Sequence, residues 1–183
     1  MSQTCYKEQI VENLLQTGGN HVRGLAKALS ANQMTISRKI EELYEENVVD
    51  YRREGRNKVF FLKKTLESKQ WACMAESRKQ LDIIRKYPRL RVIFEKIRQN
   101  PGVTLAVLFG SYANGTATDE SDIDVYIDTK EKRIKNDIGL IDTKLNVKIG
   151  SYDRENLLIR EIEKNHVIIK GADEYYEKNK FFD

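Results

Sequence analysis

The sequence has little proline and little cysteine, and each shortage narrows the class of protein. Two prolines in 183 residues leave room for long helices, because proline interrupts a helix interior. Two cysteines, Cys5 and Cys73, stand in no spacing typical of a metal site or a disulfide. No run approaches the roughly 18 apolar residues of a membrane helix, and the N-terminus has no apolar signal region. We therefore expect a helix-rich cytoplasmic protein that does not enter a membrane.

What is present fits a folded protein with a charged surface. Hydrophobic residues make up 40% of the chain and charged residues 33%, and the length allows one large domain or two small ones. The net charge of +4 permits contact with nucleic acid without requiring it.

The stretch from Phe109 to Asp124 carries the strongest pattern. An apolar run leads into Gly110-Ser111, and ten residues separate Ser111 from Asp122-Ile123-Asp124. Gly110 allows a tight turn, and Ser111 begins an expected short helix whose free N–H groups favour an anion. Asp122 and Asp124 are two apart on an expected strand, so both carboxylates leave one face and suit Mg²⁺. A surface hairpin with Gly and Asp as turn formers is the alternative interpretation.

This order of residues resembles the minimal nucleotidyltransferases, which belong to the superfamily of DNA polymerase beta. The resemblance runs from about Thr104 to the C-terminus. It implies that Gly110 and Ser111 hold ATP or another nucleoside triphosphate. Alternation along the next expected strand turns Lys148 toward the same site, where it is a candidate phosphate contact. Asp122 and Asp124 are then the catalytic and Mg²⁺-binding residues, and a nucleoside monophosphate moves to an acceptor hydroxyl. It also implies a possible HEPN-type toxin as partner, modified on a tyrosine.

The chain departs from that family at one position. Active members carry a third carboxylate on the next strand, where this sequence reads Leu145-Asn146-Val147-Lys148-Ile149. Asn146 offers an amide oxygen but accepts no proton. Asp128, Asp142 and Asp153 lie outside the matching position. Three alternatives stay open: an active transferase, a weak or inactive nucleotide-sensing transcriptional regulator, and a remnant that binds no nucleotide.

The first 64 residues predict three helices and a hairpin. The helices are expected at Lys7–Gln16, Val22–Leu29 and Met34–Glu46, the last burying Met34, Ile36, Ile40 and Leu43, with strands at Val48–Tyr51 and Lys58–Leu62. This order resembles a winged helix-turn-helix domain of microbial transcription regulators. The third helix would then enter the major groove of DNA, with the hairpin as the wing.

The resemblance assigns the exposed polar residues of the third helix and wing to DNA contact. A winged helix used for protein contacts or dimerisation is the alternative interpretation. The residues expected to bind DNA are Gln33, Thr35, Ser37, Arg38, Lys39, Arg52, Arg53, Arg56 and Lys58.

Between these parts we expect a helical connector over residues 65–100. Its first helix, Leu66–Tyr87, carries an expected apolar stripe of Trp71, Met74, Leu81 and Ile84. Because DNA-reading winged helices usually act as pairs, we expect a homodimer. The fold class is α+β: a winged helix-turn-helix domain at 1–64, the connector, and at 101–183 a nucleotidyltransferase domain with a small mixed sheet.

Overall fold

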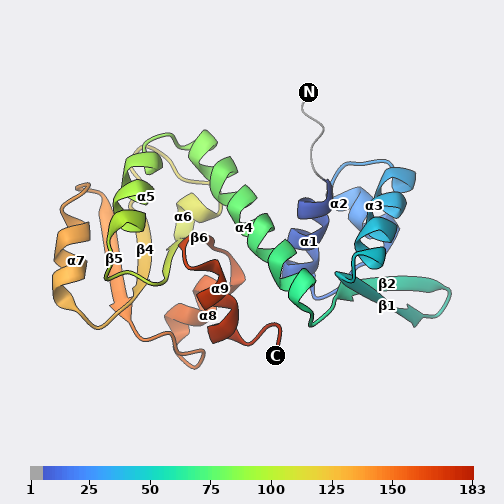
Figure 1. The fold of residues 1–183 in the computed structure, drawn as a ribbon. Helices are drawn as coiled ribbons and strands as arrows, with labels where there is room; N and C mark the ends of the chain where they lie inside the picture. Colours follow the sequence, from blue (N-terminus) through green and yellow to red (C-terminus); the bar gives the residue numbers. More distant parts are fainter. Residues whose placement is uncertain (1–5) are drawn as a thin grey trace. The chain divides into compact units, whose positions relative to one another are not determined.

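The computed structural model describes residues 6–183, and they form two compact units (Figure 1). One unit contains the described residues up to Ala75 together with Phe181–Asp183, and the other contains Glu76–Lys180. Cys5 lies outside the described residues. The two units are described one at a time.

The N-terminal unit is a winged helix-turn-helix fold. Helices α2 and α3 each begin at a side-chain cap: His21 Nδ1 accepts the Gly24 amide at 3.0 Å, and Asn32 Oδ1 accepts the Met34 amide at 2.8 Å. The elements are α1 (Tyr6–Thr17), α2 (Val22–Ala28), α3 (Gln33–Glu45), β1 (Val49–Glu54) and β2 (Asn57–Leu62), the strands being antiparallel.

The core of this unit is aliphatic, and one residue expected in it lies outside. Met34 is 81% exposed, so its predicted burial was wrong. The buried stripe of α3 runs through positions 36, 40 and 43, and at 100° per residue Met34 lies on the opposite side of the helix. The buried side chains include Ile10, Val11, Leu14, Leu25, Ile36, Ile40, Leu43, Val48 and Val49.

A backbone bridge fixes the hairpin to the helices. Asn20, in the loop between α1 and α2, exchanges both backbone hydrogen bonds with Phe60 of β2, at 2.9 and 2.8 Å. Phe60 is itself buried. The wing is therefore tied to the helical core at its middle as well as through the chain.

Helix α4 (Leu66–Lys86) has 21 residues and runs from the first unit into the second. The predicted apolar stripe was wrong in part, because Met74 and Leu81 are 49% and 51% exposed. Small side chains form most of the buried face instead, which allows close packing of the helix. The buried residues of α4 are Ser68, Ala72, Ala75, Glu76 and Ile83.

The division into units differs from the predicted three-part division. The boundary falls inside α4, between Ala75 and Glu76. Helix α5 (Leu90–Gln99) buries Leu90, Ile93, Phe94 and Ile97 in the core of the second unit, so it belongs to that unit. Whether 1–64, 65–100 and 101–183 are separate domains stays a prediction.

A mixed four-stranded sheet forms the centre of the C-terminal unit. Its order is β5-β4-β3-β6, with β4 parallel to β5 and the other pairs antiparallel. The small mixed sheet expected from the sequence is therefore present. The strands are β3 (Ala106–Phe109), β4 (Ile123–Asp128), β5 (Leu145–Gly150) and β6 (Val167–Lys170).

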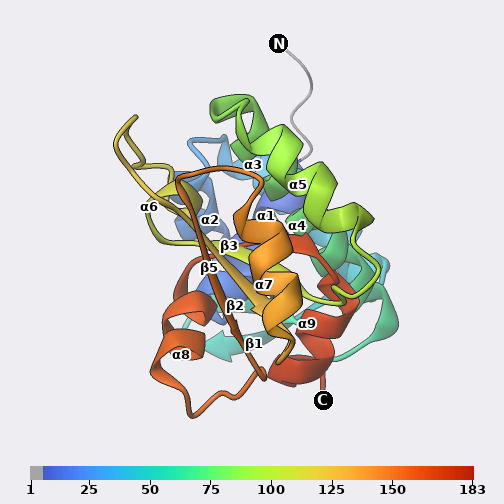
Figure 2. The same cartoon turned by 90° about the vertical axis from the view of Figure 1, so that its left-hand side faces the viewer.

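One face of the sheet packs into the buried core of the unit, and the other face carries Asp124. Val125 and Ile127 of β4 join the buried cluster to which α5 and α7 contribute, whereas Asp124 and Tyr126 alternate onto the other face. Figure 2 shows α7 and α8 on opposite sides of β5. The remaining helices are α6 (Gly110–Ala113), α7 (Lys132–Gly139), α8 (Leu157–Lys164) and α9 (Ala172–Asn179). Among residues 6–183, no helix has the length and apolar character to cross a membrane.

Candidate functional site

The turn from β3 into α6 requires glycine for two reasons. Gly110 has a φ of +70°, which disfavours other residues. A Cβ at this position would also lie 2.7 Å from Oδ2 of Asp124, closer than Cβ atoms approach other atoms in proteins. Gly110 therefore lets the start of α6, with Ser111, lie directly against the carboxylate of Asp124.

Asp124 lies between two register partners at the end of the sheet. It pairs with Phe109, the residue before Gly110, on one side and with Asn146 of β5 on the other. Ile123 is fully buried, while Asp122 just before the strand is exposed. Burial of Ile123 on the core side directs the acidic residues that flank it toward the opposite face.

Asn146 occupies the position where a third carboxylate would stand. Its Nδ2 donates to Oδ1 of Asp124 at 2.7 Å. A carboxylate here would place two negative charges side by side, whereas the amide supplies a donor. Asn146 therefore gives Asp124 a hydrogen-bond donor but accepts no proton from a substrate.

The donor set suits one hard cation held partly by a substrate. Asp122 and Asp124 offer carboxylate oxygens and Asn146 an amide oxygen, which together are too few for a cage made of protein alone. Among the described residues, no group of three or more His, Cys, Asp or Glu could hold a metal. Mg²⁺ commonly binds through one or two carboxylates plus substrate phosphates, so these residues fit that ion.

The other acidic residues weighed as substitutes are engaged elsewhere. Asp128 accepts the Tyr152 amide at 2.9 Å and pairs with Lys178 at 3.1 Å. Asp142 pairs with Arg89 at 2.8 Å, and this hydrogen-bonded guanidinium holds the pKa of the Asp142 carboxyl below its usual value. Asp153 is exposed and accepts the Glu155 amide at 3.0 Å. Asn146 is thus the polar residue of β5 that contacts Asp124.

Lys148 lies two residues beyond Asn146 on β5 and is exposed. The parallel register pairs it with Tyr126, which shares the sheet face of Asp124. The lysine is therefore on the same face as the carboxylate, one step further along the strand.

Side chains from outside the motif hold the loop that joins α6 to β4. Lys86 Nζ donates to the carbonyl of Gly115 at 2.6 Å, and the Tyr87 hydroxyl donates to that of Ala117 at 3.4 Å. Lys144 Nζ donates to the carbonyl of Asp119. Sequence reasoning missed these three residues, because a lysine that holds a distant carbonyl has no local pattern.

A separate groove in the N-terminal unit lies between α3 and the wing. It has a volume of about 580 Å³, and Gln33, Ser37, Arg56 and Lys58 are among its lining residues. Its other lining residues were not predicted as site residues: His21, Val22, Arg23, Ile40, Glu41, Tyr44, Tyr51, Asn57 and Phe60.

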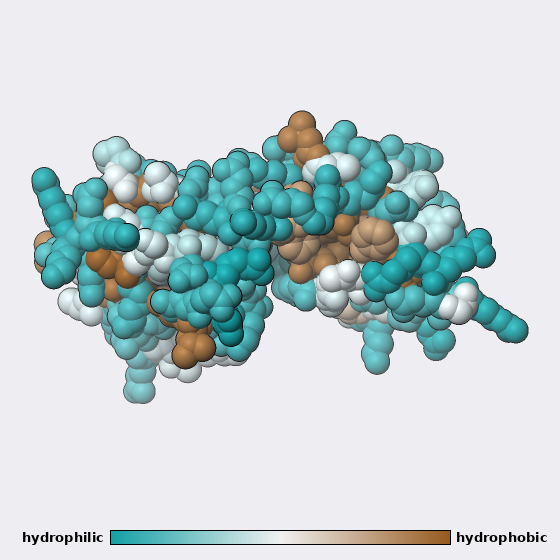
Figure 3. All heavy atoms as spheres, turned by 90° about the horizontal axis from the view of Figure 1, so that it is seen from below, coloured by the Kyte–Doolittle hydropathy of each residue, from teal (hydrophilic) through white to brown (hydrophobic). Residues whose placement is uncertain are grey.

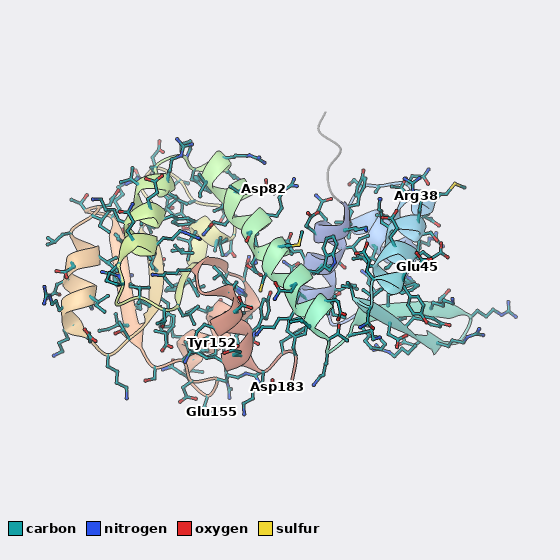
Figure 4. The ribbon with its side chains drawn as sticks, viewed as in Figure 1. Arg38, Glu45, Asp82, Tyr152, Glu155 and Asp183 are labelled. Atoms are coloured by element: carbon teal, nitrogen blue, oxygen red, sulfur yellow. The ribbon has the colours of Figure 1, made fainter. Side chains whose placement is uncertain are left out.

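The remaining predicted DNA contacts differ in availability. Arg38 has 72% of its side chain exposed and projects from α3 (Figure 4). Arg53 is exposed, whereas Thr35 is half-buried. Lys39 is bonded to Glu42 at 2.8 Å and Arg52 to Glu54 at 2.7 Å. Arg38 and Arg53 are therefore both exposed, and Arg38 Nε lies 4.0 Å from Oε1 of Glu42.

Comparison with known proteins finds a family match over the C-terminal site. Residues 92–175 match the family model Polymerase beta, Nucleotidyltransferase. This match spans every motif position from Gly110 to Lys148, so most of the C-terminal unit is similar to a nucleotidyltransferase domain. The matched segment begins within α5, in agreement with the packing of that helix on the sheet.

The other comparisons add less. No curated protein matches the chain. Among solved structures, the chain is similar to the adhesin competence repressor (AdcR) from Streptococcus pyogenes. The TM-score is 0.42 and the identity 22%, over 49% of this chain and 67% of that chain.

Proposed function

We propose that the C-terminal unit binds a nucleoside triphosphate with Mg²⁺ and transfers a nucleoside monophosphate to an acceptor hydroxyl. The observation that carries the proposal is the position of Asp124, which lies against Gly110 on one side and is bonded to Asn146 on the other. Gly110 and Ser111 hold the β and γ phosphates, and Lys148 lies on the same sheet face to neutralise phosphate charge. Asp122 and Asp124 are the metal ligands.

In the transfer, a bond forms between the acceptor oxygen and the α phosphorus, and the bond to pyrophosphate breaks. Asp122 and Asp124 would hold Mg²⁺, which would supply neutralisation of the charge that builds up on the phosphate oxygens. The acceptor proton goes to water or to one of the two aspartates, since Asn146 takes none. The contribution of the chain is mainly positioning and charge neutralisation, so we expect slow turnover.

Calorimetry with ATP and Mg²⁺ tests this proposal on the wild type and on the double variant Asp122→Ala/Asp124→Ala. Mg²⁺-dependent binding that the double variant loses supports a nucleotide site, and labelled ATP then identifies the acceptor. Absence of binding at millimolar ATP contradicts both the transferase and the nucleotide-sensing proposal.

A second candidate is a nucleotide-sensing regulator with little or no turnover, and Asn146 is the observation that favours it. The winged helix would bind DNA through the groove residues, Arg38 and the other predicted contacts of α3 and the wing. Nucleotide occupancy would then change DNA affinity, which requires two states that bind nucleotide differently. DNA titrations with and without ATP distinguish the two candidates. In the regulator ATP changes the DNA affinity, whereas in a transferase without this coupling the DNA affinity is the same with and without ATP.

A homodimer and a HEPN-type toxin partner belong to the same proposal. The half-exposed Met74 and Leu81 are seven residues apart on α4, so they share a helix face that a second copy could cover. The surface in Figure 3 is mainly hydrophilic, with smaller apolar patches. Sedimentation of the wild type and of Met74→Ser/Leu81→Ser tests the dimer, since loss of self-association in the variant supports it.

A further inference from the structure

The two edge strands of the C-terminal sheet, β5 and β6, differ in whether their outer backbone groups have hydrogen-bond partners. At β6, Gln80 Nε2 donates to the carbonyls of Ile168 and Ile169 at 3.0 and 2.9 Å, and Arg98 Nη1 donates to Ile169 at 3.0 Å. Along β5, no strand of the described chain pairs with the edge that faces away from β4. An edge with unpaired backbone groups is a template for another strand.

The hydrogen-bond pattern identifies the backbone groups available on β5. The Ile123 amide donates to the carbonyl of Lys144 at 2.8 Å, which sets the alternation of the parallel pair. Even-numbered residues of β5 therefore bond to β4, and odd-numbered residues point outward. The Leu145 amide is used by Asp142 at 3.1 Å. The carbonyl of Leu145, both groups of Val147 and the amide of Ile149 remain directed outward.

A groove accompanies this edge where it meets α7. It has a volume of about 430 Å³ and includes Leu140, which is 87% exposed. The other lining residues are Lys135, Asn136, Gly139, Leu145, Asn146 and Val147, so a lysine is present and no carboxylate. Figure 2 shows α7 and β5 at the front of the C-terminal unit.

The positive charge beside the β5 edge favours a partner with acidic side chains. Lys135 on the groove and Lys148 on β5 are both exposed. Within residues 6–183 neither lysine forms an ion pair, and the nearby Asp137 pairs with Arg133 at 3.8 Å. An extended segment with acidic side chains would pair with Lys135, and with Lys148 when no nucleotide is bound. An apolar side chain of the segment would cover Leu140.

We propose that an extended acidic segment of a partner protein docks on the outer edge of β5 as a fifth strand and carries the acceptor hydroxyl. The acceptor role rests on the proposed transferase function. In transfer the attacking and leaving oxygens lie roughly in line on opposite sides of phosphorus. With the leaving phosphates at Ser111 beside β3, the acceptor approaches from the side of β5. Asn146, which lines the groove and bonds to Asp124, marks that side.

The first measurement is titration of short peptides into the full chain, without nucleotide, followed by amide NMR. Three peptides are compared: one that alternates Thr and Val with several Glu residues, one with Lys in place of Glu, and one with a central Pro. We expect the acidic peptide to bind at least about tenfold tighter than its Lys counterpart. The amide signals of Val147 and Ile149 shift on binding, and the Pro peptide does not bind.

Two variants and a control test the location. Ile149→Pro removes an outward amide, a change that an edge strand tolerates, so the pairing with β4 is kept. Lys135→Glu reverses the charge of the groove, and Lys96→Glu on α5 makes the same change of net charge outside it. We expect Ile149→Pro and Lys135→Glu to lose binding of the acidic peptide, and the control Lys96→Glu to keep it. Thermal unfolding checks that each variant is folded. If Ile149→Pro does not fold, Lys135→Glu alone tests where the peptide binds.

Three results would overturn the docking proposal. The acidic and basic peptides could bind equally, or the two variants could bind as the wild type does. Self-association of the chain that Ile149→Pro abolishes would assign the edge to a second copy instead. Peptide binding that persists while ATP binding is absent leaves the docking surface in place and contradicts only the transferase function and the acceptor role.

Discussion

Asn146 donates its amide hydrogen to Asp124 across the parallel strands β4 and β5, at 2.7 Å. This contact replaces what would be a repulsion between two carboxylates in the three-acid form of the site. The amide donates a hydrogen bond to Asp124, and unlike a carboxylate it accepts no proton. We therefore expect the pair to affect both the stability of the site without a metal and the proposed transfer.

Asn146→Asp should make folding depend on Mg²⁺. Without the ion, two adjacent carboxylates repel and the melting temperature falls, whereas added Mg²⁺ restores it and increases any transfer from labelled ATP. Thermal unfolding across a Mg²⁺ series measures the effect. Asn156→Asp, at the cap of α8, is the matched control, because aspartate also caps a helix. A variant as stable as the wild type without Mg²⁺ would contradict the assigned role of the contact.

Gly110→Ala should abolish nucleotide binding and cost roughly 1–3 kcal/mol of folding free energy, from backbone strain and the contact with Asp124. Gly115→Ala is a close control, since Gly115 also has a φ of +70° but its Cβ would meet only the flexible end of Lys86. Denaturant unfolding gives the folding free energy and calorimetry the ATP affinity of both variants. Together they separate the effect of backbone strain from the effect of moving residue 110 away from Asp124. Equal effects in the two variants would refute the importance of that approach.

Lys86→Met should weaken ATP binding several-fold while changing the free energy of unfolding by less than about 1 kcal/mol. The reason is that Lys86 holds the carbonyl of Gly115 and so orders the loop between Ser111 and Asp122. Lys86→Arg keeps a donor and is expected to retain most of the affinity. Calorimetry of the three proteins is the measurement, and a loss in both variants alike would favour a general structural effect.

Arg38→Ala and Arg56→Ala should each reduce the salt dependence of DNA binding by about one unit of slope, if each residue neutralises one phosphate. Fluorescence anisotropy with duplex DNA at several salt concentrations gives the slope. Lys130→Ala removes an exposed positive charge in the C-terminal unit and serves as the control. Unchanged slopes in both arginine variants would favour a winged helix used for protein contacts.

Acid should destabilise the C-terminal unit through His166. Burial, with the nearby charge of Lys79, lowers the pKa of His166 to about 3. Nε2 lies 3.8 Å from Glu76, and the Tyr175 hydroxyl is 3.5 Å from Nδ1. Between about pH 6.5 and 3 the unfolded chain binds a proton that the folded chain does not, so stability falls as pH decreases.

Lowering the pH from about 7 to 5 should therefore remove about 2 kcal/mol through this group. Denaturant unfolding at both values should show a smaller loss in His166→Gln, even if that variant is less stable at pH 7. Tyr175→Phe keeps the histidine and should keep the wild-type loss. An equal pH dependence in His166→Gln and the wild type would show that other groups cause the acid effect.

Local pattern was sufficient for the three helices and the hairpin of the N-terminal unit and for the strands that carry Asp124 and Asn146, whereas helix α9, after β6, was not predicted. Alternation along β5 places Asn146 and Lys148 on the face opposite Val147, and the register with β4 agrees. The hydrophobic pattern failed where a helix carries apolar residues on more than one face. Met34 of α3 and Met74 and Leu81 of α4 were expected to be buried but are exposed. It also gave no sign of Lys86, whose partner is 29 residues away, because a contact between distant backbone and side chain has no periodicity.

The bridge between Asn20 and Phe60 has a consequence for the entropy of the proposed DNA binding. A wing joined to its domain only at the hairpin base would sample many orientations and lose that freedom on contact with a groove. Here the middle of β2 is already hydrogen-bonded to the loop between α1 and α2, so most of that ordering occurs during folding. The wing and α3 would thus meet the duplex as one preorganised surface, with little affinity lost to loop immobilisation.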